Sequence, residues 1–354
     1  MPARILIVAL LVGVGLGCSR DSGRARGAGV EPGAPVGQIA FVRDGKLLLI
    51  KPDGTGERLL VADVDDRLPF DWSSDGKHIA YTAARQQGGA ADLMLVSTDP
   101  NAAKPTNLTR LPGGVARSPA FAPDSRAVAF MRDAPAGLYV RKLGAEGEAR
   151  RLTHDGQIEQ VPAWVPDGRG IVYGELVFTD ESAVNKFRME LQLAAYDAAA
   201  TGVAAVSKVP TGDGPADSPA FAPAGARRLL AYRARRGNEE VALLDLGQPG
   251  AAERNLTRSP ADEHDPRFSP DGKRIAFWRL RAGGQHELCT MTADGAELAV
   301  VCSLPATAEP GVAEWSPDAR HLAFVTSEAL CTVPAGGGEP VRLAKVSNAT
   351  VRWR

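Results

Sequence analysis

The chain from Ile39 to Arg354 repeats one pattern of apolar and polar positions. Each copy begins with an aromatic residue on a short apolar segment, followed by a turn of the Pro-Asp-Gly type and an apolar segment of the type Ile-Ala-Phe. A third apolar segment comes next, and a second turn leads to a fourth. Because Pro pre-sets φ and Gly accepts a positive φ, Pro-Asp-Gly predicts a tight turn between two strands. Each copy therefore predicts four antiparallel strands, which form one blade of a β-propeller.

Six complete copies of the pattern align with one another. The clearest copy runs from Pro266 to Phe277, and the most degenerate, from Pro219 to Tyr232, has Ala224 in place of the turn Asp. The repeated aromatic residues are Trp72, Phe121, Trp164, Phe221, Phe268 and Trp315. Their average spacing of about 49 residues falls among the blade lengths of propellers. A four-stranded sheet cannot bury both of its faces alone, so the blades must stack side by side.

The two ends of the chain supply a seventh blade. Val351–Trp353 predicts a lone first strand, and the region 39–61 begins with the second-strand motif and continues with the third and fourth strands. Pairing of the C-terminal strand (351–354) with the N-terminal strands (39–61) closes the ring and removes the free sheet edge. The sequence therefore predicts an all-β fold, a single seven-bladed β-propeller of four-stranded antiparallel blades over residues 37–354.

Residues 1–17 predict a signal peptide. One basic residue, Arg4, precedes an apolar run from Ile5 to Leu16. This run is too short to cross a bilayer of about 30 Å as a helix, and its position is typical of a secretory signal. Residues 18–36 are rich in Gly, Pro and charge and lack periodic apolar positions, so we expect a flexible tether before the propeller.

The signal peptide ends in the tetrad Gly15-Leu16-Gly17-Cys18. This tetrad resembles the lipobox of bacterial lipoproteins, which implies that Cys18 is lipidated and becomes the mature N-terminus. Ser19 follows it, and similarity to the enterobacterial sorting rule favours the outer membrane. We therefore expect a lipid-anchored protein on the periplasmic side of the bacterial envelope that contacts the membrane through its anchor only. The alternative is an ordinary signal peptide cut nearby, which leaves a soluble periplasmic protein.

The repeats resemble the WD40-like, or PD40, family, known from TolB and from prolyl-oligopeptidase-type propellers. The resemblance covers about residues 37–354, rests on motifs such as Pro266–Phe277, and implies the fold rather than the function. TolB carries an α/β domain before a six-bladed propeller, whereas only the tether precedes the seven blades counted here. The resemblance therefore implies a TolB-like propeller lipoprotein that is not TolB itself.

Three cysteines fall on predicted strands. Cys289 and Cys302 lie on the third and fourth strands of one blade, and Cys331 occupies the third-strand site of the next. Hairpin pairing places Cys302 opposite or diagonal to Cys289, and Cα separations of about 5.5 Å suit a disulfide. In an oxidising periplasm, Cys289–Cys302 is a possible disulfide; alternatively, all three cysteines are small buried apolar residues. No CxxC or HxxxH spacing occurs, so we expect neither a metal nor a cofactor.

The charge balance excludes one class of partner and the distribution of charge suggests another. The formal net charge is -1, which gives no electrostatic footprint for nucleic acid. On one face of the predicted propeller, inter-blade loops are acidic and the loops between second and third strands are basic. If the acidic and basic loops form separate regions of electrostatic potential, they can orient a binding partner. The alternative is that the two sets of loops neutralise each other through surface ion pairs, worth about 0–1 kcal/mol each.

Residues 175–190 predict a long loop on the same face. The loop contains apolar residues, which is typical of a packed flap or of a binding element on a rigid scaffold. Arginine and aromatic residues dominate binding hot spots. The candidate binding residues of this face are Arg235, Arg236, Phe178, Phe187, Asp217, His264 and Asp265.

These features predict a non-catalytic binding or scaffolding module, monomeric and tethered to the envelope, with an envelope protein or polymer as its partner. No Gly-x-Ser-x-Gly motif appears, and we expect no catalytic residues. The alternative is a small-substrate enzyme of the polysaccharide lyase or lactonase type that uses the propeller pore. Oligogalacturonate lyases are seven-bladed and use pore histidines, and here only His264 and His154 could reach the pore. Three or more His, Glu or Asp in metal-ligand geometry at the pore would favour the enzyme.

Overall fold

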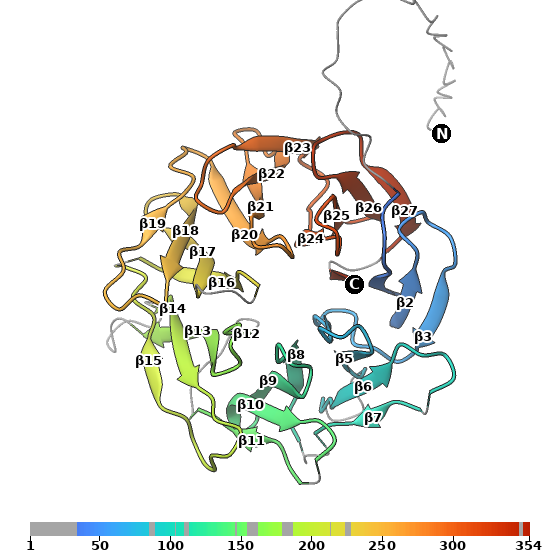
Figure 1. Ribbon diagram of the computed structural model, residues 1–354. Helices are drawn as coiled ribbons and strands as arrows, with labels where there is room; N and C mark the ends of the chain where they lie inside the picture. The colour runs from blue at the N-terminus through green and yellow to red at the C-terminus, as the bar shows by residue number, and fades with distance from the viewer. Residues whose placement is uncertain are drawn as a thin grey trace, which may run out of the picture. The chain divides into compact units, whose positions relative to one another are not determined.

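Strands and turns make up the propeller (Figure 1). The computed structural model describes residues 34–84, 89–102, 104–109, 113–145, 147–153, 162–178, 187–212, 214–223, 228–346 and 350–354. They form seven four-stranded antiparallel sheets around a central channel, within one compact unit that spans Ala34–Arg354. Among these residues, no helix combines the length and the apolar character needed to cross a membrane.

The seven sheets are the blades, numbered here in chain order with their strands given from the channel outward. Blade 1 contains β28 (Val351–Trp353), β1 (Ile39–Arg43), β2 (Lys46–Ile50) and β3 (Arg58–Val61). Blade 2 contains β4 (Asp71–Trp72), β5 (His78–Thr82), β6 (Leu93–Ser97) and β7 (Thr106–Asn107). Blade 3 contains β8 (Ala116–Phe121), β9 (Ala127–Asp133), β10 (Ala136–Lys142) and β11 (Arg150–Arg151).

The other four blades follow the same order. Blade 4 contains β12 (Ala163–Trp164), β13 (Gly170–Phe178), β14 (Phe187–Ala195) and β15 (Val206–Lys208). Blade 5 contains β16 (Ala216–Phe221), β17 (Leu229–Arg235), β18 (Glu239–Asp245) and β19 (Arg254–Asn255). Blade 6 contains β20 (Asp262–Phe268), β21 (Arg274–Leu280), β22 (His286–Thr292) and β23 (Ala299–Leu304). Blade 7 contains β24 (Glu314–Trp315), β25 (His321–Val325), β26 (Ala329–Pro334) and β27 (Val341–Lys345).

The repeated Pro-Asp-Gly segment makes the turn from the first strand of a blade to the second. In blade 6, Ser269 Oγ lies 2.6 Å from Asp271 Oδ1, and Asp271 Oδ1 accepts the Lys273 N–H at 3.1 Å. Gly272 has φ +70°, the left-handed region that the turn requires. Blades 3 and 7 place Ser125 and Ala319 at this position with φ 59° and 58°. Turn geometry therefore overrides the usual glycine preference in two of the copies.

Each junction between neighbouring blades has its own apolar cluster. Successive side chains on a strand point to opposite faces of the sheet, so every blade contributes to the clusters on both of its sides. Trp164 packs in the cluster between blades 3 and 4, where Tyr196 meets its ring edge to face at 4.9 Å between centroids. Trp278 and Phe324 make the same kind of contact between blades 6 and 7, at 5.4 Å. The core is thus a ring of interfaces, as expected for stacked sheets.

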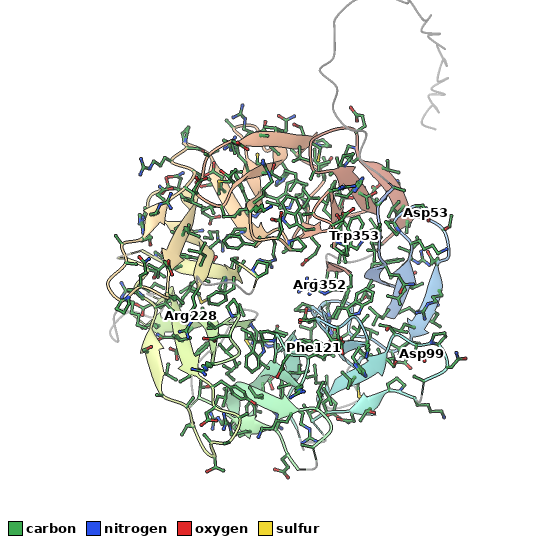
Figure 2. All side chains as sticks on the ribbon, in the orientation of Figure 1. Asp53, Asp99, Phe121, Arg228, Arg352 and Trp353 are labelled. Atoms are coloured by element: carbon green, nitrogen blue, oxygen red, sulfur yellow. The ribbon has the colours of Figure 1, made fainter. Side chains whose placement is uncertain are left out.

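The predicted closure by the two chain ends is confirmed. Strand β28 pairs with β1 in the register Ile39↔Trp353, Ala40↔Arg352 and Phe41↔Val351. The Trp353 side chain is 2% exposed, and its Nε1–H donates to the Val36 carbonyl at 2.8 Å. Arg354 N–H donates to the Gln38 carbonyl at 3.0 Å. Figure 2 shows Arg352 of this strand at the centre of the ring, with Asp53 and Asp99 at the rim.

The expectation of a long loop over residues 175–190 is wrong where the structure describes it. Strands β13 and β14 pair continuously from Gly170↔Ala195 to Phe178↔Phe187, so Glu175–Phe178 and Phe187–Glu190 form a hairpin. The Glu190 carboxylate, which is buried, lies 3.0 Å from Lys208 Nζ and 2.6 Å from Arg188 Nε, so both cations balance its charge. Residues 179–186, between the strands, lie outside the described residues.

Candidate functional site: the central channel

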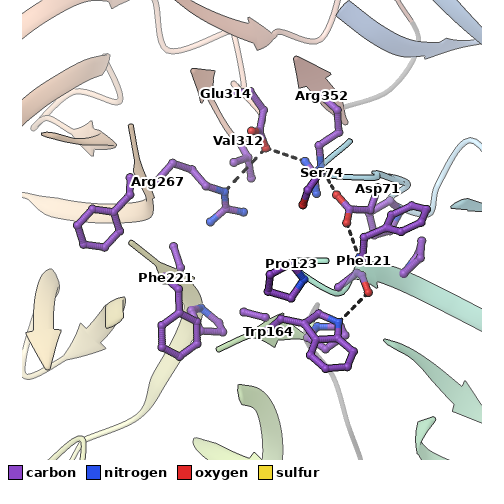
Figure 3. A pocket seen from close by; sticks show the side chains of 18 of the residues that line it. Asp71, Ser74, Phe121, Pro123, Trp164, Phe221, Arg267, Val312, Glu314 and Arg352 are labelled. Carbon is purple, nitrogen blue, oxygen red and sulfur yellow. Dashed lines mark hydrogen bonds and ion pairs between the residues drawn. The ribbon is translucent and has the colours of Figure 1, made fainter. Parts of the chain in front are cut away.

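The first strands of the seven blades surround a channel with a cavity volume of about 850 Å³ (Figure 3). In each blade, the residue immediately before the repeated aromatic residue faces this cavity. Side chains alternate along a strand, so this residue points to the channel when its neighbour packs between blades. The seven channel-facing residues, called the channel ring below, are Asp71, Ala120, Ala163, Ala220, Arg267, Glu314 and Arg352.

The channel ring divides into two walls, and the charged wall comes from blades 6, 7, 1 and 2. Along it the residues alternate in sign: Arg267, Glu314, Arg352 and Asp71. Arg352 Nη1 lies 2.7 Å from Glu314 Oε1, and Arg352 Nε lies 3.1 Å from Asp71 Oδ1. Arg267 Nε is more distant from Glu314 Oε1, at 3.9 Å. Asp71 Oδ2 also accepts the Phe121 N–H at 2.8 Å, so both of its oxygens are bonded.

The apolar wall comes from blades 3, 4 and 5. Its members of the channel ring are Ala120, Ala163 and Ala220. The Trp164 indole beside them is already satisfied, because its Nε1–H donates to the Ala120 carbonyl at 2.9 Å. Prolines close to the three alanines in sequence also line the cavity: Pro119, Pro123, Pro162, Pro166, Pro219 and Pro223. The channel ring is therefore charged on one side and apolar on the other, although Arg117, Ser118 and Ser218 also line the cavity from blades 3 and 5.

Three first strands carry a β-bulge at the channel. Ser118, Ser218 and Asp265 have φ 53°, 51° and 53°, and each precedes a proline. A non-glycine residue in this region costs about 1–3 kcal/mol, and such strain concentrates at functional sites. Bulges also re-aim side chains, and all three residues line the cavity. Ser218 Oγ lies 3.2 Å from Asp265 Oδ1 of the neighbouring blade.

Asp265 is the carboxylate with the most strongly perturbed pKa in the channel. Its Oδ2 lies 3.0 Å from His264 Nδ1. Burial opposes ionisation, but the hydrogen bond from His264 and the positive charges of His264, Arg267 and Arg233 outweigh it and lower the pKa of Asp265 to about 2. The carboxylate lies between the Ser218 hydroxyl and the His264 imidazole. A Ser-His-Asp triad needs the imidazole in the middle, so this cluster does not have the arrangement of a nucleophilic triad.

The other candidate binding residues are distributed over blades 4 and 5. Asp217 pairs with Arg233, with 2.5 Å from Arg233 Nε to Asp217 Oδ1. Arg235 forms an ion pair with Glu239, and Arg236 forms one with Glu253. The two predicted contact arginines thus have acidic partners within blade 5. Phe178 and Phe187 are backbone partners in the β13–β14 hairpin, and their side chains lie outside the described residues.

The acidic inter-blade loops and the basic loops of the same face are joined by ion pairs. Glu263, at 0% exposure, receives the Arg279 Nε–H at 3.0 Å, and Arg279 Nη1 lies 3.8 Å from Glu287. Together with the Asp217–Arg233 pair, this contact favours neutralisation over two separated rings of potential. The candidate face of Arg235, Arg236 and their neighbours remains a prediction.

The possible Cys289–Cys302 disulfide is not formed. Cys289, Cys302 and Cys331 are buried free thiols. The ladder between β22 and β23 shifts register at Leu288 and Cys289, so Cys302 pairs with Leu288 and Cys289 pairs with Val300. Cys289 packs in the cluster between blades 5 and 6, whereas Cys302 packs with Cys331 between blades 6 and 7. Burial raises the pKa of Cys289 and of Cys302 to about 12, so both are protonated at neutral pH.

Cys18 and His154 lie outside the described residues. Among the residues that are described, no group of three or more His, Cys, Asp or Glu has the geometry to hold a metal ion. His264 is bonded to Asp265, and burial together with the charge of His264 lowers the pKa of His286. Aligning the six copies at their aromatic residues and reading the preceding position would have identified the channel ring, which loop-by-loop inspection of charge missed.

Solved structures that match this chain include a peptidase, TolB and an oligogalacturonate lyase. A puromycin-hydrolysing peptidase of Mycobacterium tuberculosis matches with a TM-score of 0.63 at 14% identity, over 89% of this chain and 53% of that one. TolB from Acinetobacter baumannii matches with a TM-score of 0.56 at 17% identity, over 90% and 81%. An oligogalacturonate lyase in complex with manganese matches with a TM-score of 0.59 at 14% identity, over 88% and 85%.

These similarities show the fold and no specific function. The chain spans about half the length of the peptidase. No protein-family model and no curated protein matches the sequence. At such low identities, the chain is a seven-bladed propeller that resembles those of TolB, of peptidases and of oligogalacturonate lyases, and function must be argued from its own channel and surfaces.

Proposed function

We propose that the chain is a non-catalytic binding module, a TolB-like propeller lipoprotein held by a lipid on Cys18 to the periplasmic side of the bacterial envelope. The signal segment 1–17 and the lipobox-like residues before Cys18 support the anchor, and Ser19 supports the outer membrane as its location. The partner is an envelope protein or polymer, and the propeller acts as a monomer. The seven-bladed fold supplies a rigid scaffold with an accessible channel and two loop faces.

The pairing of the channel carboxylates carries this proposal. Asp71 and Glu314 are both bonded to Arg352, and Asp265 is bonded to His264. A general acid or base must exchange a proton with the substrate. These carboxylates are instead committed to neighbouring cations, and Asp265 in particular stays ionised down to about pH 2. Such a channel is better suited to hold a ligand than to transfer protons.

Affinity capture from solubilised envelopes tests the binding function. The full-length lipidated protein is the bait, and residues 1–36 fused to an unrelated soluble domain are the matched control. We expect an envelope component that the propeller retains and the tether control does not. Equal recovery on both baits would contradict a binding role for the propeller.

The anchor is tested separately with Cys18→Ala. This variant should move from the membrane fraction to the soluble periplasm, and unchanged membrane partitioning would refute lipidation at Cys18. The enzyme alternative is tested by incubating the protein with oligogalacturonates and with lactones, with and without Mn²⁺. Turnover that exceeds a heat-denatured control would replace the binding proposal with a pore enzyme.

A further inference from the structure

Two arginines share one carboxylate oxygen in the channel, and each keeps an unused donor. Glu314 Oε1 lies 2.7 Å from Arg352 Nη1 and 3.9 Å from Arg267 Nε. The remaining contacts of Arg267 and Arg352 use Nη1 and Nε: Arg267 Nη1 donates to Pro266 O at 2.9 Å, and Arg352 Nε donates to Asp71. Within the described parts of the chain, neither Nη2 group has a protein partner. Figure 3 shows both guanidinium groups directed into the cavity.

Arg267 makes the weakest direct contact with a carboxylate in the charged wall. Its ion pair with Glu314 is the longest of the charged wall, and Glu314 is already bonded more closely to Arg352. Burial lowers the pKa of the Arg267 guanidinium, and the neighbouring charge of Arg352 adds to this effect, while the negative charges of Glu314, Asp265 and Asp71 oppose it. Among the described residues, Arg267 thus has acidic neighbours but no direct hydrogen bond to a carboxylate, and such an arginine in a confined cavity favours an incoming anion. The unused binding capacity of this wall is therefore for negative charge.

The opposite wall specifies the rest of the ligand. Ala120, Ala163 and Ala220 face the arginines across the cavity, and the prolines beside them present no N–H donor. Apart from Arg117, Ser118 and Ser218, which also line the cavity from blades 3 and 5, this wall offers a hydrated inorganic anion only apolar surface. A molecule with an apolar body would remove apolar surface from water there, worth about 25 cal/mol for each Å² buried. A cavity of about 850 Å³ is in the range of small-molecule sites.

We propose that the channel binds a carboxylate carried on an apolar body, with the carboxylate between Arg267 and Arg352 and the body against the alanine wall. This proposal rests on the proposed binding function and names the ligand class of its channel. The unused Nη2 group of each arginine can donate to one oxygen of the carboxylate, and such charge-assisted hydrogen bonds are strong. The carboxylate comes either from a small organic acid or from the C-terminus of a peptide, and the test separates these sources.

Isothermal titration calorimetry of the intact protein uses two pairs of probes. 3-Phenylpropionate and its amide represent small acids, and a blocked tripeptide ending in phenylalanine, as the free acid and as the amide, represents a peptide terminus. We expect at least one free acid to bind, at least tenfold more tightly than its amide. Binding of the small acid alone assigns the site to organic acids, and binding of the peptide acid alone assigns it to peptide termini. Inorganic phosphate, which lacks the apolar body, should bind at least tenfold more weakly than the preferred acid.

Variants locate the site. Arg267→Gln should weaken acid binding at least tenfold and leave amide binding unchanged, because Glu314 keeps its closer partner Arg352. Arg342→Gln is the matched control, since Arg342 lies exposed on the outermost strand of blade 7, and it should bind as the wild type does. Ala163→Phe, which fills the apolar side, should abolish binding of acid and amide alike. Melting temperatures check that each variant is folded.

Three results would overturn the proposal: no binding of either acid, equal binding of acids and amides, or acid binding that both Arg267→Gln and Ala163→Phe leave intact. Phosphate that competes as tightly as the acids would also overturn it, because the apolar wall would then contribute nothing. These outcomes are separate from failure of the binding module itself. An envelope partner captured by the propeller while all probes fail would refute the channel ligand and keep the module.

Discussion

The last strand should stabilise the ring as much as an internal first strand does. Trp353→Ala tests this, because Trp353 is 2% exposed within the apolar cluster between blades 7 and 1. Truncating a buried Trp costs about 3–5 kcal/mol, and loss of the Nε1–H bond to the Val36 carbonyl adds about 1 kcal/mol. We therefore expect a loss of about 4–6 kcal/mol in the free energy of unfolding, a large share of a typical 5–15 kcal/mol.

Thermal and urea unfolding measure this loss. With an unfolding entropy of about 2.1 cal/mol/K for each residue, a propeller of this size loses about 1.5 °C per kcal/mol, so Tm should fall by about 6–9 °C. Trp315→Ala is the matched comparison, because Trp315 is 4% exposed and donates to the Arg267 carbonyl at 3.0 Å. Val341→Ala, at a position 58% exposed on an outer strand, should shift stability by less than about 0.5 kcal/mol.

The comparison between the two tryptophans decides the question. Similar losses for Trp353→Ala and Trp315→Ala mean that the C-terminal strand is held as firmly as a strand inside the chain. If Trp315→Ala is costly and Trp353→Ala behaves like Val341→Ala, the closing strand contributes little and the reasoning is refuted. Deletion of residues 351–354 should then also be silent, whereas closure predicts early melting and aggregation through the exposed edge of β1.

Three further predictions concern the seam, the channel and the thiols. A Cβ at Gly37 (φ +92°) would lie 2.4 Å from the Arg354 carbonyl oxygen, whereas a Cβ at Gly76 (φ +73°) would meet nothing within 4 Å. Gly37→Ala should therefore lower Tm clearly more than Gly76→Ala. Equal decreases in Tm would contradict the close approach of Gly37 to Arg354. Because the pKa of Asp265 is about 2, below its ordinary 3.8, the stability it contributes, about 2 kcal/mol, is present above about pH 4 and is lost as the pH falls toward 2. The difference in Tm between wild type and Asp265→Asn should decrease as the pH falls from about 4 to about 2. A constant difference in Tm would argue against a lowered pKa of Asp265. In a Cys18→Ala background, a thiol reagent should react slowly with the native protein and titrate three thiols after denaturation; a single thiol would indicate a disulfide.

The number of blades could be predicted because several independent sequence features indicate the same local structure in each repeat. Apolar alternation and the aromatic position agree in every copy and the turn residues in most of them, and the motif split between Ile39 and Trp353 specifies how the ring closes. Local features of this kind depend on neighbours in sequence. The degenerate copy in blade 5 still forms four strands, because stacking on blades 4 and 6 supplies what its own sequence lacks.

The exact pairing register of individual residues between strands could not be predicted from the sequence. A hairpin with regular pairing brings Cys289 and Cys302 together, but one bulge sends them to opposite faces of the blade. The bulges at Ser118, Ser218 and Asp265 were missed for the same reason, since a serine or aspartate before proline has no unique backbone signature. Their role becomes visible only when strands from different blades meet at the channel.

Charge pairing across a face also depends on distances that spacing along the chain does not give. The arginines chosen as contact residues, Arg235 and Arg236, have acidic partners in their own blade. Arg267, the arginine with an unused donor, could not be predicted from its own copy, because one basic residue beside an aromatic is ordinary there. Its place in a ring of charged and small residues is apparent only from the same position in all seven blades.

Each blade contributes one side chain of the channel ring to the cavity and so influences which ligand the cavity accepts. In every blade the ring residue stands next to the aromatic that packs between blades, and the two side chains point in different directions, as in Ala163 beside Trp164. Substitution at a ring position can therefore change the chemistry of the cavity with little effect on the packing that holds the blades. The charge and size of the side chains at these seven positions together determine the chemistry of the cavity. Selection or design could change them one blade at a time. A family of such propellers could diverge in ligand while their cores stay nearly constant.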